Sequence, residues 1–429
     1  MRIKIKNKKE FIILFNSLYK EVKINIINGL SIDSRKIQKN DIYFPIVGAN
    51  YNGHDFINSS FKSGAIISFS EYSSKNKNII KTKSVKYEID RICKEWYKLS
   101  KSRIIGITGS NGKTTIKNLM YHIFKDQYQC SKTKGNYNST LGLPLTFLST
   151  PLNDDFCILE YGASKPNEIE TLCKIVKPYY SFITNISNAH IENYKSLNEI
   201  YKTKIALYKY THHKGIVFIN SDNISLNREK IKSNIVKFSI KNKSVNQKNI
   251  NIRQKKIPTH LLHIKDTIES ACIISQVLNI DSRVINHAIK SFNLPIGRGN
   301  LINYKNYSII DDSYNANPKS VELAINRLNT MKNKGKKIMI FGDMLELGNK
   351  KILEHKNLSK LINKSNIDII LTYGDLTKHT NANISISKYS KHYTNIEQLK
   401  IALNNIVCCN DLVYLKGSRN MRLEQIYKF

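Results

Sequence analysis

The sequence lacks long apolar runs. A membrane-spanning helix needs about 18 or more consecutive apolar residues, and no stretch of this 429-residue chain reaches that length. In the basic N-terminal stretch MRIKIKNKKEFIILF the apolar run extends only from Phe11 to Phe15, whereas a secretory signal needs about 7–15 apolar residues and a small-residue cleavage site. We therefore expect a cytoplasmic, unprocessed protein that is not inserted into a membrane.

Cysteine is scarce and shows no metal-binding or disulfide pattern. The seven cysteines form no Cys-x-x-Cys pair and no even-numbered framework, and Cys408 and Cys409 are adjacent. This distribution argues against disulfide bonds and against a structural zinc site. We expect buried free thiols.

Acidic residues are few, with 33 Asp and Glu against 68 Lys and Arg, so the net charge is +35. Such a charge suits nucleic acid or an acidic, phosphate-bearing substrate. It also fits an A/T-rich genome, because Lys, Asn and Ile recur everywhere. The densest basic stretch, Arg228 to Lys256, contains one aromatic residue, Phe238, and lacks the interleaved stacking side chains of a single-strand binder. We expect no nucleic-acid partner, although a basic nucleic-acid-binding module stays an alternative.

The length allows two or three domains. Residues 1–98 alternate short apolar strands with turns. Residues 99–296 repeat a strand–loop–helix rhythm, in which FCILEY, YSFITNI and GIVFIN are the strands. The rhythm resumes over residues 297–429, after a Pro- and Gly-containing stretch, NLPIGRGN, that we interpret as a hinge. This alternation predicts an α/β protein with largely parallel sheets covered by helices.

The stretch GITGSNGKTT, residues 106–115, carries the clearest chemical signal. It departs from the P-loop pattern G-x-x-x-x-G-K-[ST], because Ile107 stands where the first glycine is expected. Its context is nevertheless that of a P-loop. The strand RIIGIT precedes it, and TTIKNLMYHIF follows with apolar residues at helical spacing. Backbone N–H groups at a helix N-terminus favour phosphate, so we predict a nucleotide site.

The individual residues of the loop suit this task. Gly109 and Gly112 let the backbone wrap an anion, Lys113 supplies positive charge, and the Thr114 hydroxyl is placed for Mg²⁺. The alternative is a turn that contains Gly-Lys-Thr by chance. The candidate nucleotide-binding residues are Gly109, Ser110, Asn111, Gly112, Lys113, Thr114 and Thr115.

From about residue 31 to residue 424 the sequence resembles the Mur ligase family. TGSNGKTT is similar to the family's ATP loop, and SIDSRKIQKNDIYFPIVGANYNGHDFI is similar to its uridine-nucleotide-binding domain. The stretches TKGNYNSTLGLPLTFL, DDSYNANPKS, FGDMLELG and LKGSRNMR resemble the member that joins D-alanyl-D-alanine to UDP-N-acetylmuramoyl-tripeptide. The preceding ligase of the pathway, which adds a diamino acid, carries an Asp-Asn-Pro-Arg motif that is absent here.

The resemblance implies three α/β domains: a UDP-sugar-binding domain over residues 1–98, a P-loop-type ATPase domain with a parallel sheet over 99–296, and a Rossmann-like domain over 297–429. It implies a monomer that uses ATP and two Mg²⁺ ions. ATP would phosphorylate a carboxylate to an acyl phosphate, which the incoming amine attacks to give the pentapeptide precursor of peptidoglycan. Metals and cations should dominate catalysis, since negative charge collects on the transferring phosphoryl group.

The resemblance also implies roles for single residues. Thr114, Glu160 and His190 would bind metal, together with Lys204 in a carbamylated form, although Ile205 and Ala206 replace the usual residues after that lysine. Taken alone, these residues also fit a strand-end carboxylate, a structural histidine and an exposed helix lysine. Arg298 in the hinge would reach the nucleotide phosphates, where a guanidinium binds in a bidentate manner.

The remaining implied contacts concern nucleotide and substrates. Asp312 and Asn315 in DDSYNANP would meet the nucleotide, while Pro318 in the same motif suits a helix start. Asn and Ser on loops also make turns, so these assignments compete with purely structural ones. The candidate substrate-binding residues are Ser34, Arg35, Asn52, His54, Asn136, Asn138, Ser164, Asn317, Lys416, Ser418 and Arg419.

One departure from the family concerns the adenine region. The family has His-Asn-x-x-Asn before a small-residue helix, whereas here His263 is followed by Ile264 and Thr267. Adenine would then be held differently or more weakly. An inactive ligase kept as a scaffold therefore stays an alternative, beside the diamino-acid-adding ligase.

Overall fold

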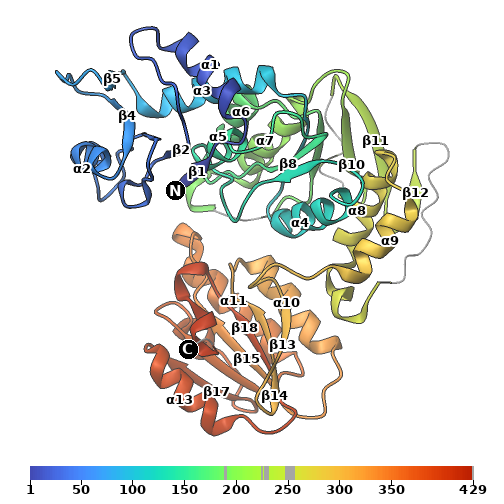
Figure 1. Cartoon of the computed structure of the whole chain (residues 1–429). Coiled ribbons are helices and arrows are strands. Elements are labelled where there is room, and N and C mark those ends of the chain that lie inside the picture. The colour runs from blue at the N-terminus through green and yellow to red at the C-terminus, as the bar shows by residue number, and fades with distance from the viewer. Residues whose placement is uncertain (188–190, 224–225, 227–230, 247–256, 428–429) are drawn as a thin grey trace.

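The chain builds three sheets with helices around them (Figure 1). The computed structural model describes residues 1–429 except 188–190, 224–225, 227–230, 247–256 and 428–429. The first two sheets lie together in the upper part of Figure 1, and the third forms the lower part. The boundaries near residues 98 and 296 stay predictions.

The first sheet has five strands in the order β1-β2-β3-β4-β5, antiparallel only between β1 and β2. Helix α3 packs beside it because its apolar residues recur at helical spacing, and Ser84 caps its start by accepting the Tyr87 N–H. The elements are β1 Arg2–Lys4, α1 Lys8–Leu18, β2 Gly29–Ser31, η1 Ser34–Lys36, β3 Asp41–Tyr43, η2 Gly53–Phe56, α2 Ile57–Lys62, β4 Ala65–Ser70, β5 Ile79–Lys81 and α3 Val85–Leu99.

The second sheet has seven strands in the order β12-β11-β10-β9-β6-β8-β7, all parallel except β12. The expected parallel sheet is thus confirmed. The strands are β6 Arg103–Thr108, β7 Cys130–Lys132, β8 Phe156–Glu160, β9 Tyr180–Ile183, β10 Ile216–Asn220, β11 Asn234–Ser239 and β12 Ser244–Val245. The helices are α4 Lys113–Phe124, α5 Gly142–Leu148, α6 Glu168–Ile175, η3 Ile191–Asn193, α7 Leu197–Lys209, η5 Thr259–Ile264, α8 Lys265–Val277 and α9 Ser282–Ser291.

The third sheet has six strands in the order β13-β14-β18-β15-β16-β17, with β13 antiparallel to β14. Helix α10 begins at Pro318 behind a capping box formed by Asn317 and Ser320, as the sequence predicts for a proline at the first helical position. The strands are β13 Asn300–Tyr304, β14 Tyr307–Asp312, β15 Lys337–Gly342, β16 Ile369–Tyr373, β17 Tyr389–Tyr393 and β18 Leu412–Lys416. The helices are α10 Pro318–Thr330, η6 Gly348–Lys350, α11 Lys351–Asn363, α12 Lys378–Asn381, α13 Ile396–Ile406, η7 Arg419–Met421 and η8 Leu423–Ile426.

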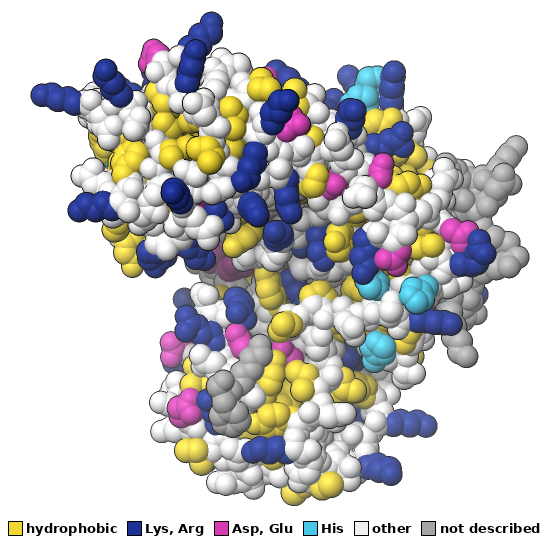
Figure 2. All heavy atoms as spheres, viewed as in Figure 1, with side chains coloured by type: hydrophobic (Ala, Val, Ile, Leu, Met, Phe, Trp, Pro, Cys, Tyr) yellow, Lys and Arg dark blue, Asp and Glu magenta, His cyan; other side chains and the backbone are white. Residues whose placement is uncertain are grey.

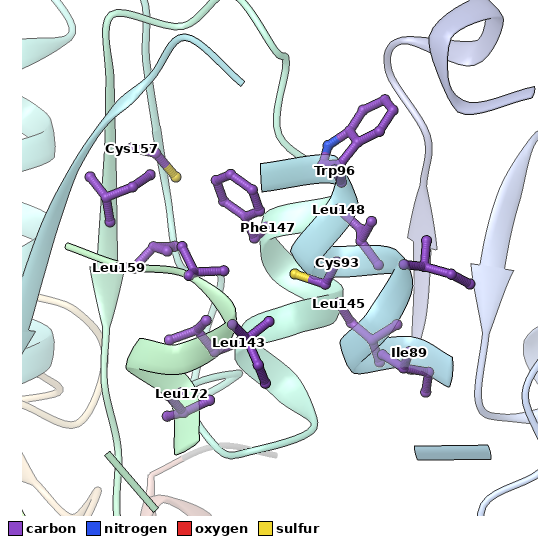
Figure 3. Close-up of a cluster of buried hydrophobic side chains, with 14 of the residues drawn as sticks. Ile89, Cys93, Trp96, Leu143, Leu145, Phe147, Leu148, Cys157, Leu159 and Leu172 are labelled. Atoms are coloured by element: carbon purple, nitrogen blue, oxygen red, sulfur yellow. The ribbon is translucent and has the colours of Figure 1, made fainter. Parts of the chain in front are cut away.

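The first two units share one hydrophobic core. Figure 3 shows Ile89, Cys93 and Trp96 of α3 facing side chains of α5, while β8 and α6 close the cluster from the other side. The third unit has apolar clusters of its own. The N-terminal and central units are therefore joined by apolar packing, and the C-terminal unit is built around separate cores.

The cysteine expectation is wrong at two positions. All seven thiols are free. Four are buried and Cys130 is half-buried, but Cys408 and Cys409 are exposed. They lie in the turn between α13 and β18, where the chain has left the core. Within the described residues, no helix is long and apolar enough to cross a membrane. Of the basic stretch, 228–230 and 247–256 lie outside the described residues.

Candidate active site

A cleft of about 1720 Å³ lies between the central and C-terminal units. Figure 2 shows a hollow between the upper and lower parts of the molecule, with Lys and Arg side chains gathered above it. The cleft lies at the carboxyl end of β6, between its neighbours β8 and β9, where open parallel sheets bind ligands. The candidate residues that line it are Ser110, Asn111, Gly112, Lys113, Thr114, Thr115, Asn136, Asn138, Glu160, Ser164, Arg298, Asp312, Asn315, Asn317 and Lys416.

The glycine-rich loop joins β6 to α4, as predicted. Gly109 has φ +147°, and a Cβ there would lie 1.9 Å from Thr184 Oγ1. Gly112 has φ +80° and precedes the first helical residue, Lys113. Both glycines are therefore required by backbone conformation, and the free N–H groups of α4 face the cleft.

The segment after β9 braces this loop, a feature that sequence reasoning missed. The backbone N–H of Ser110 donates to the Asn185 carbonyl at 2.9 Å, and the Asn111 N–H donates to Asn185 Oδ1 at 3.0 Å. Ser187 N–H donates to Ser110 Oγ at 2.8 Å, while the Thr184 hydroxyl donates to the Asn111 carbonyl at 2.6 Å. The loop is held in one shape by the segment that follows the adjacent strand.

Lys113 folds back over the loop. Its ammonium donates to the Gly109 carbonyl at 2.7 Å and to the Ser110 carbonyl at 3.2 Å. Burial lowers the pKa of Lys113, and the negative charge of Glu160 opposes that shift. A cation held at the mouth of a loop of free N–H groups is suited to bind phosphate oxygens.

Glu160 ends β8 and is 1% exposed. It accepts a hydrogen bond from the Thr114 hydroxyl at 3.0 Å and another from Asn138 Nδ2 at 2.8 Å. The Lys117 ammonium lies 3.4 Å from its Oε2, and Lys117 also donates to the Gly135 carbonyl at 3.2 Å. The carboxylate is thus fixed beside the loop by three side chains.

Lys117 was missed from the sequence, although a signal existed. It lies four residues after Lys113 on α4, so helical periodicity places both lysines on one face. The residue is 1% exposed, and burial lowers the pKa of Lys117, with Glu160 opposing the shift.

Lys204 lies on α7 and is 3% exposed. Burial, and secondly the charge of Lys113, lower the pKa of Lys204 to about 7. His190 lies outside the described residues. Among the residues that are described, no three His, Cys, Asp or Glu side chains gather as a metal site would require.

The C-terminal unit reaches across to the loop. Arg298 Nη2 donates to Thr114 Oγ1 at 3.2 Å, and the guanidinium lies 3.8 Å from the centre of the Tyr314 ring. Arg298 Nε is buried without a hydrogen-bond partner among the described residues. Asn317 Nδ2 donates to Asn111 Oδ1 at 2.8 Å. The structure thus brings the hinge arginine and the YNANP motif onto the nucleotide loop.

At the far wall of the cleft Lys416 pairs with Asp312 at 2.8 Å, and Lys416 is 3% exposed. Asn315 lines the cleft beside them. Ser418 is buried, and its hydroxyl accepts the Leu345 N–H at 2.8 Å. Arg419 lies outside the cleft, where it pairs with a carboxylate of η8.

The N-terminal candidates do not line this cleft. Asn52 caps η2 and its Oδ1 lies 2.9 Å from His54 Nδ1. His54 is buried, and its Nε2 accepts a backbone N–H from Glu71 at 3.1 Å. Arg35 is exposed and pairs with the aspartate before Ser34. Their assignment to a UDP-sugar stays a prediction.

The segment predicted to lie near adenine also lines the cleft. Ile264 and Thr267, from the end of η5 and the start of α8, line the same cleft as Asn326 and Arg327 of α10. Arg327 donates from both Nη atoms to the Gly299 carbonyl at 3.2 Å. The substituted positions therefore border the cleft.

These features define a three-unit α/β protein with a P-loop-type site closed by a C-terminal Rossmann-like unit, which is the architecture of an ATP-dependent ligase. Three successive family descriptions match the sequence: "Mur ligase family, catalytic domain" at residues 26–101, "Mur ligase middle domain" at 107–279 and "Mur ligase, glutamate ligase domain" at 297–419. The chain belongs to the Mur ligase family.

Relatives and solved structures match over nearly the whole chain. The UDP-N-acetylmuramoyl-tripeptide–D-alanyl-D-alanine ligase of Bacillus subtilis is 29% identical, covering 94% of this chain and 93% of that protein. The ligase of the same name from Buchnera aphidicola is also 29% identical, covering 96% and 94%. A structure of MurF from Acinetobacter baumannii has TM-score 0.86 at 20% identity, covering 97% of each chain. MurF ligase from Thermotoga maritima, in complex with ADP, has TM-score 0.79 at 24% identity, covering 92% and 95%. The expected fold class is confirmed.

Proposed function

We propose that the protein joins D-alanyl-D-alanine to UDP-N-acetylmuramoyl-tripeptide by ATP-driven amide formation. The relatives that match over more than nine tenths of both chains carry this activity in their names. The observation on which the proposal depends is the closed cleft. Its nucleotide loop, buried Glu160 and Arg298 come from two units and meet within hydrogen-bond distance.

ATP would bind with its phosphates on the loop from Gly109 to Thr115. Lys113 and the N–H groups of α4 would hold the terminal phosphates. Arg298 would contact them from the C-terminal side, because its buried Nε still lacks an acceptor among the described residues. A guanidinium with a free N–H edge is suited to a phosphate oxygen. Asp312 and Asn315 would border the nucleotide.

Two Mg²⁺ ions would be held by Thr114, Glu160, His190 and Lys204, the last as a carbamate. The donors fit, because a hydroxyl and a buried carboxylate are hard oxygen ligands and a lysine with pKa of about 7 has a neutral fraction that can react with carbon dioxide. The metal would offset negative charge on the transferring phosphoryl group. Thr114 and Glu160 are already hydrogen-bonded to each other, so little reorganisation is required.

The two substrates would approach the cleft from opposite units. Asn136, Asn138 and Ser164 line the central wall and would orient the tripeptide carboxylate. Asn317, Lys416, Ser418 and Arg419 would hold the dipeptide, and the N-terminal unit would hold the uridine nucleotide. Holding carboxylate and amine together removes much of the entropic barrier to their reaction.

Phosphate release by the purified protein, with ATP and Mg²⁺, tests the proposal. Release that requires both UDP-muramoyl-tripeptide and D-Ala-D-Ala, with a pentapeptide product by mass, supports it. Release with the dipeptide precursor and a free diamino acid instead would place the protein one step earlier in the pathway. No turnover by a folded sample with any acceptor would contradict ligase activity and favour a scaffold.

A further inference from the structure

Residues 191–194, which are η3 and the residue after it, contact both units that form the cleft. We call them the connecting segment. They belong to the central unit, but Ile191 and Glu192 lie against the C-terminal unit. Tyr194, at the other end, lies against a loop of the central wall of the cleft. The connecting segment therefore links two parts of the site that are far apart in the sequence.

Ile191 anchors the connecting segment to the C-terminal unit. Its half-buried side chain packs against an apolar cluster of that unit, to which the buried Met344 and Leu347 belong. The two units thus meet through apolar packing as well as through the polar contacts of Arg298 and Asn317. Apolar packing depends on shape, so Ile191 favours one placement of the C-terminal unit over others.

The turn after Leu347 is shaped to receive the connecting segment. Gly348 has φ +53°, and a Cβ at this position would lie 3.1 Å from both Cα and Cβ of Glu192. The Glu192 N–H also donates to the Glu346 carbonyl at 3.4 Å. A side chain at position 348 would crowd this contact, and the positive φ favours glycine as well.

Tyr194 anchors the other end of the connecting segment to the cleft wall. Its side chain is buried, and its hydroxyl donates to the Lys165 carbonyl at 3.1 Å. Lys165 follows Ser164, which lines the cleft, in the loop between β8 and α6. Glu168 holds the same loop by accepting the N–H groups of Ser164 and Lys165, at 2.7 and 3.0 Å. The position of Ser164 thus depends on Tyr194 as well as on Glu168.

We propose that Ile191 and Tyr194 are positioning residues that couple closure of the C-terminal unit to the loop carrying Ser164. When that unit closes, Ile191 and Gly348 fix the place of the connecting segment, and Tyr194 passes this placement to the loop. Nucleotide binding, which the closed unit completes through Arg298, then favours the loop arrangement that receives the tripeptide. This inference rests on the proposed function, because it takes Ser164 to contact that substrate.

Calorimetric binding of UDP-muramoyl-tripeptide, with and without Mg²⁺ and the β,γ-imido analogue of ATP, measures the coupling. In wild type the analogue should tighten binding of the tripeptide substrate at least about fivefold, the lower end of common coupling factors. Tyr194→Phe removes only the hydroxyl, and Ile191→Ala removes the apolar contact. Each should reduce the factor to less than about twofold, while affinity for the tripeptide substrate alone stays near the wild-type value. Ile191→Leu conserves volume and should keep the coupling.

Two variants serve as matched controls. Tyr97→Phe removes the same kind of bond, because the Tyr97 hydroxyl donates to the Lys177 carbonyl at 3.0 Å and neither residue lines the cleft. Ile401→Ala matches Ile191→Ala, because Ile401 is 62% exposed on α13. Both controls should keep the wild-type coupling factor.

A wild-type factor near one, or an unchanged factor in Tyr194→Phe, would overturn the inference. Weak binding of the tripeptide substrate by Tyr194→Phe even without the analogue would also overturn it, since Tyr194 would then serve only the fold of the loop. A folded wild-type protein that binds the analogue but not UDP-muramoyl-tripeptide would contradict the proposed function itself, and this inference with it.

Discussion

Replacing Lys117 by methionine should destabilise the central unit and make it more dependent on Mg²⁺. The side chains of Lys117 and Glu160 are 1% and 2% exposed, and their charged atoms are 3.4 Å apart. Methionine retains most of the side-chain volume, but it removes the cation and leaves Glu160 as a buried charge. The Thr114 hydroxyl and Asn138 amide still donate to that carboxylate, so the loss is limited to the charge of the lysine.

Removing one partner of a buried ion pair costs about 3–5 kcal/mol, and the two remaining donors place the expected loss near 3 kcal/mol. For a unit of about 150–250 residues, 1 kcal/mol shifts the melting temperature by about 2–4 °C. We therefore expect a decrease of about 6–12 °C. The double variant Lys117→Met/Glu160→Gln should lose less, because no uncompensated charge stays buried.

Differential scanning calorimetry is the appropriate assay, because it resolves the transitions of a multi-unit protein. Added Mg²⁺ should stabilise Lys117→Met more than wild type, since a divalent cation would supply the missing charge beside Glu160. Lys98→Met is the control: its exposed pair with Glu95, at 2.7 Å, contributes about 0–1 kcal/mol. A shift no larger than that of the control, or an equal response to Mg²⁺, would refute the role of Lys117.

Three further predictions concern the glycine-rich loop and residues near it. Gly109→Ala should weaken ATP binding at least about tenfold by calorimetry, because its Cβ would meet Thr184 Oγ1 at 1.9 Å and the residue would keep a positive φ. Arg298→Lys should weaken ATP binding nearly as much as Arg298→Ala, since lysine keeps the charge but not the planar fork; recovery of full affinity by lysine would contradict this. Burial lowers the pKa of Lys204 from 10.5 to about 7, so the unfolded chain binds more protons between those values and stability should rise with pH there. Urea midpoints in buffer free of carbon dioxide should show this slope in wild type and a shallower one in Lys204→Met.

The local sequence pattern was enough to predict the parts of the site that a single segment forms. The strand, turn and helix around the nucleotide loop could be predicted, because the apolar pattern changes from that of a strand to that of a helix after Thr108. These elements are β6 and α4. Glu160 could be placed because a strand carries it to the sheet edge that the loop shares. Lys117 could have been predicted in the same way, because it follows Lys113 at helical spacing.

Contacts that depend on topology could not be predicted in this way. Asn185 and Ser187 brace the loop only because β9 pairs with β6. The order of strands in a sheet cannot be predicted from the sequence of either strand alone. The bond between Asn317 and Asn111 requires two units to meet. At the N-terminal unit the sequence could not separate a cap from a ligand, because Asn52 caps η2 while standing in a polar loop.

The distribution of apolar and polar contacts determines which unit can move. The N-terminal and central units share one hydrophobic core, so separating them would expose large apolar surface. The C-terminal unit meets the nucleotide loop through polar contacts from Arg298 and Asn317, and its backbone changes direction at Gly297 and Gly299, which have φ of +74° and +89°. Opening would therefore occur most readily at this hinge. Because Arg298 and Asn317 both belong to the C-terminal unit, such a motion would withdraw their contacts from Thr114 and Asn111 together. Closure would then bring both side chains back to the glycine-rich loop in a single step.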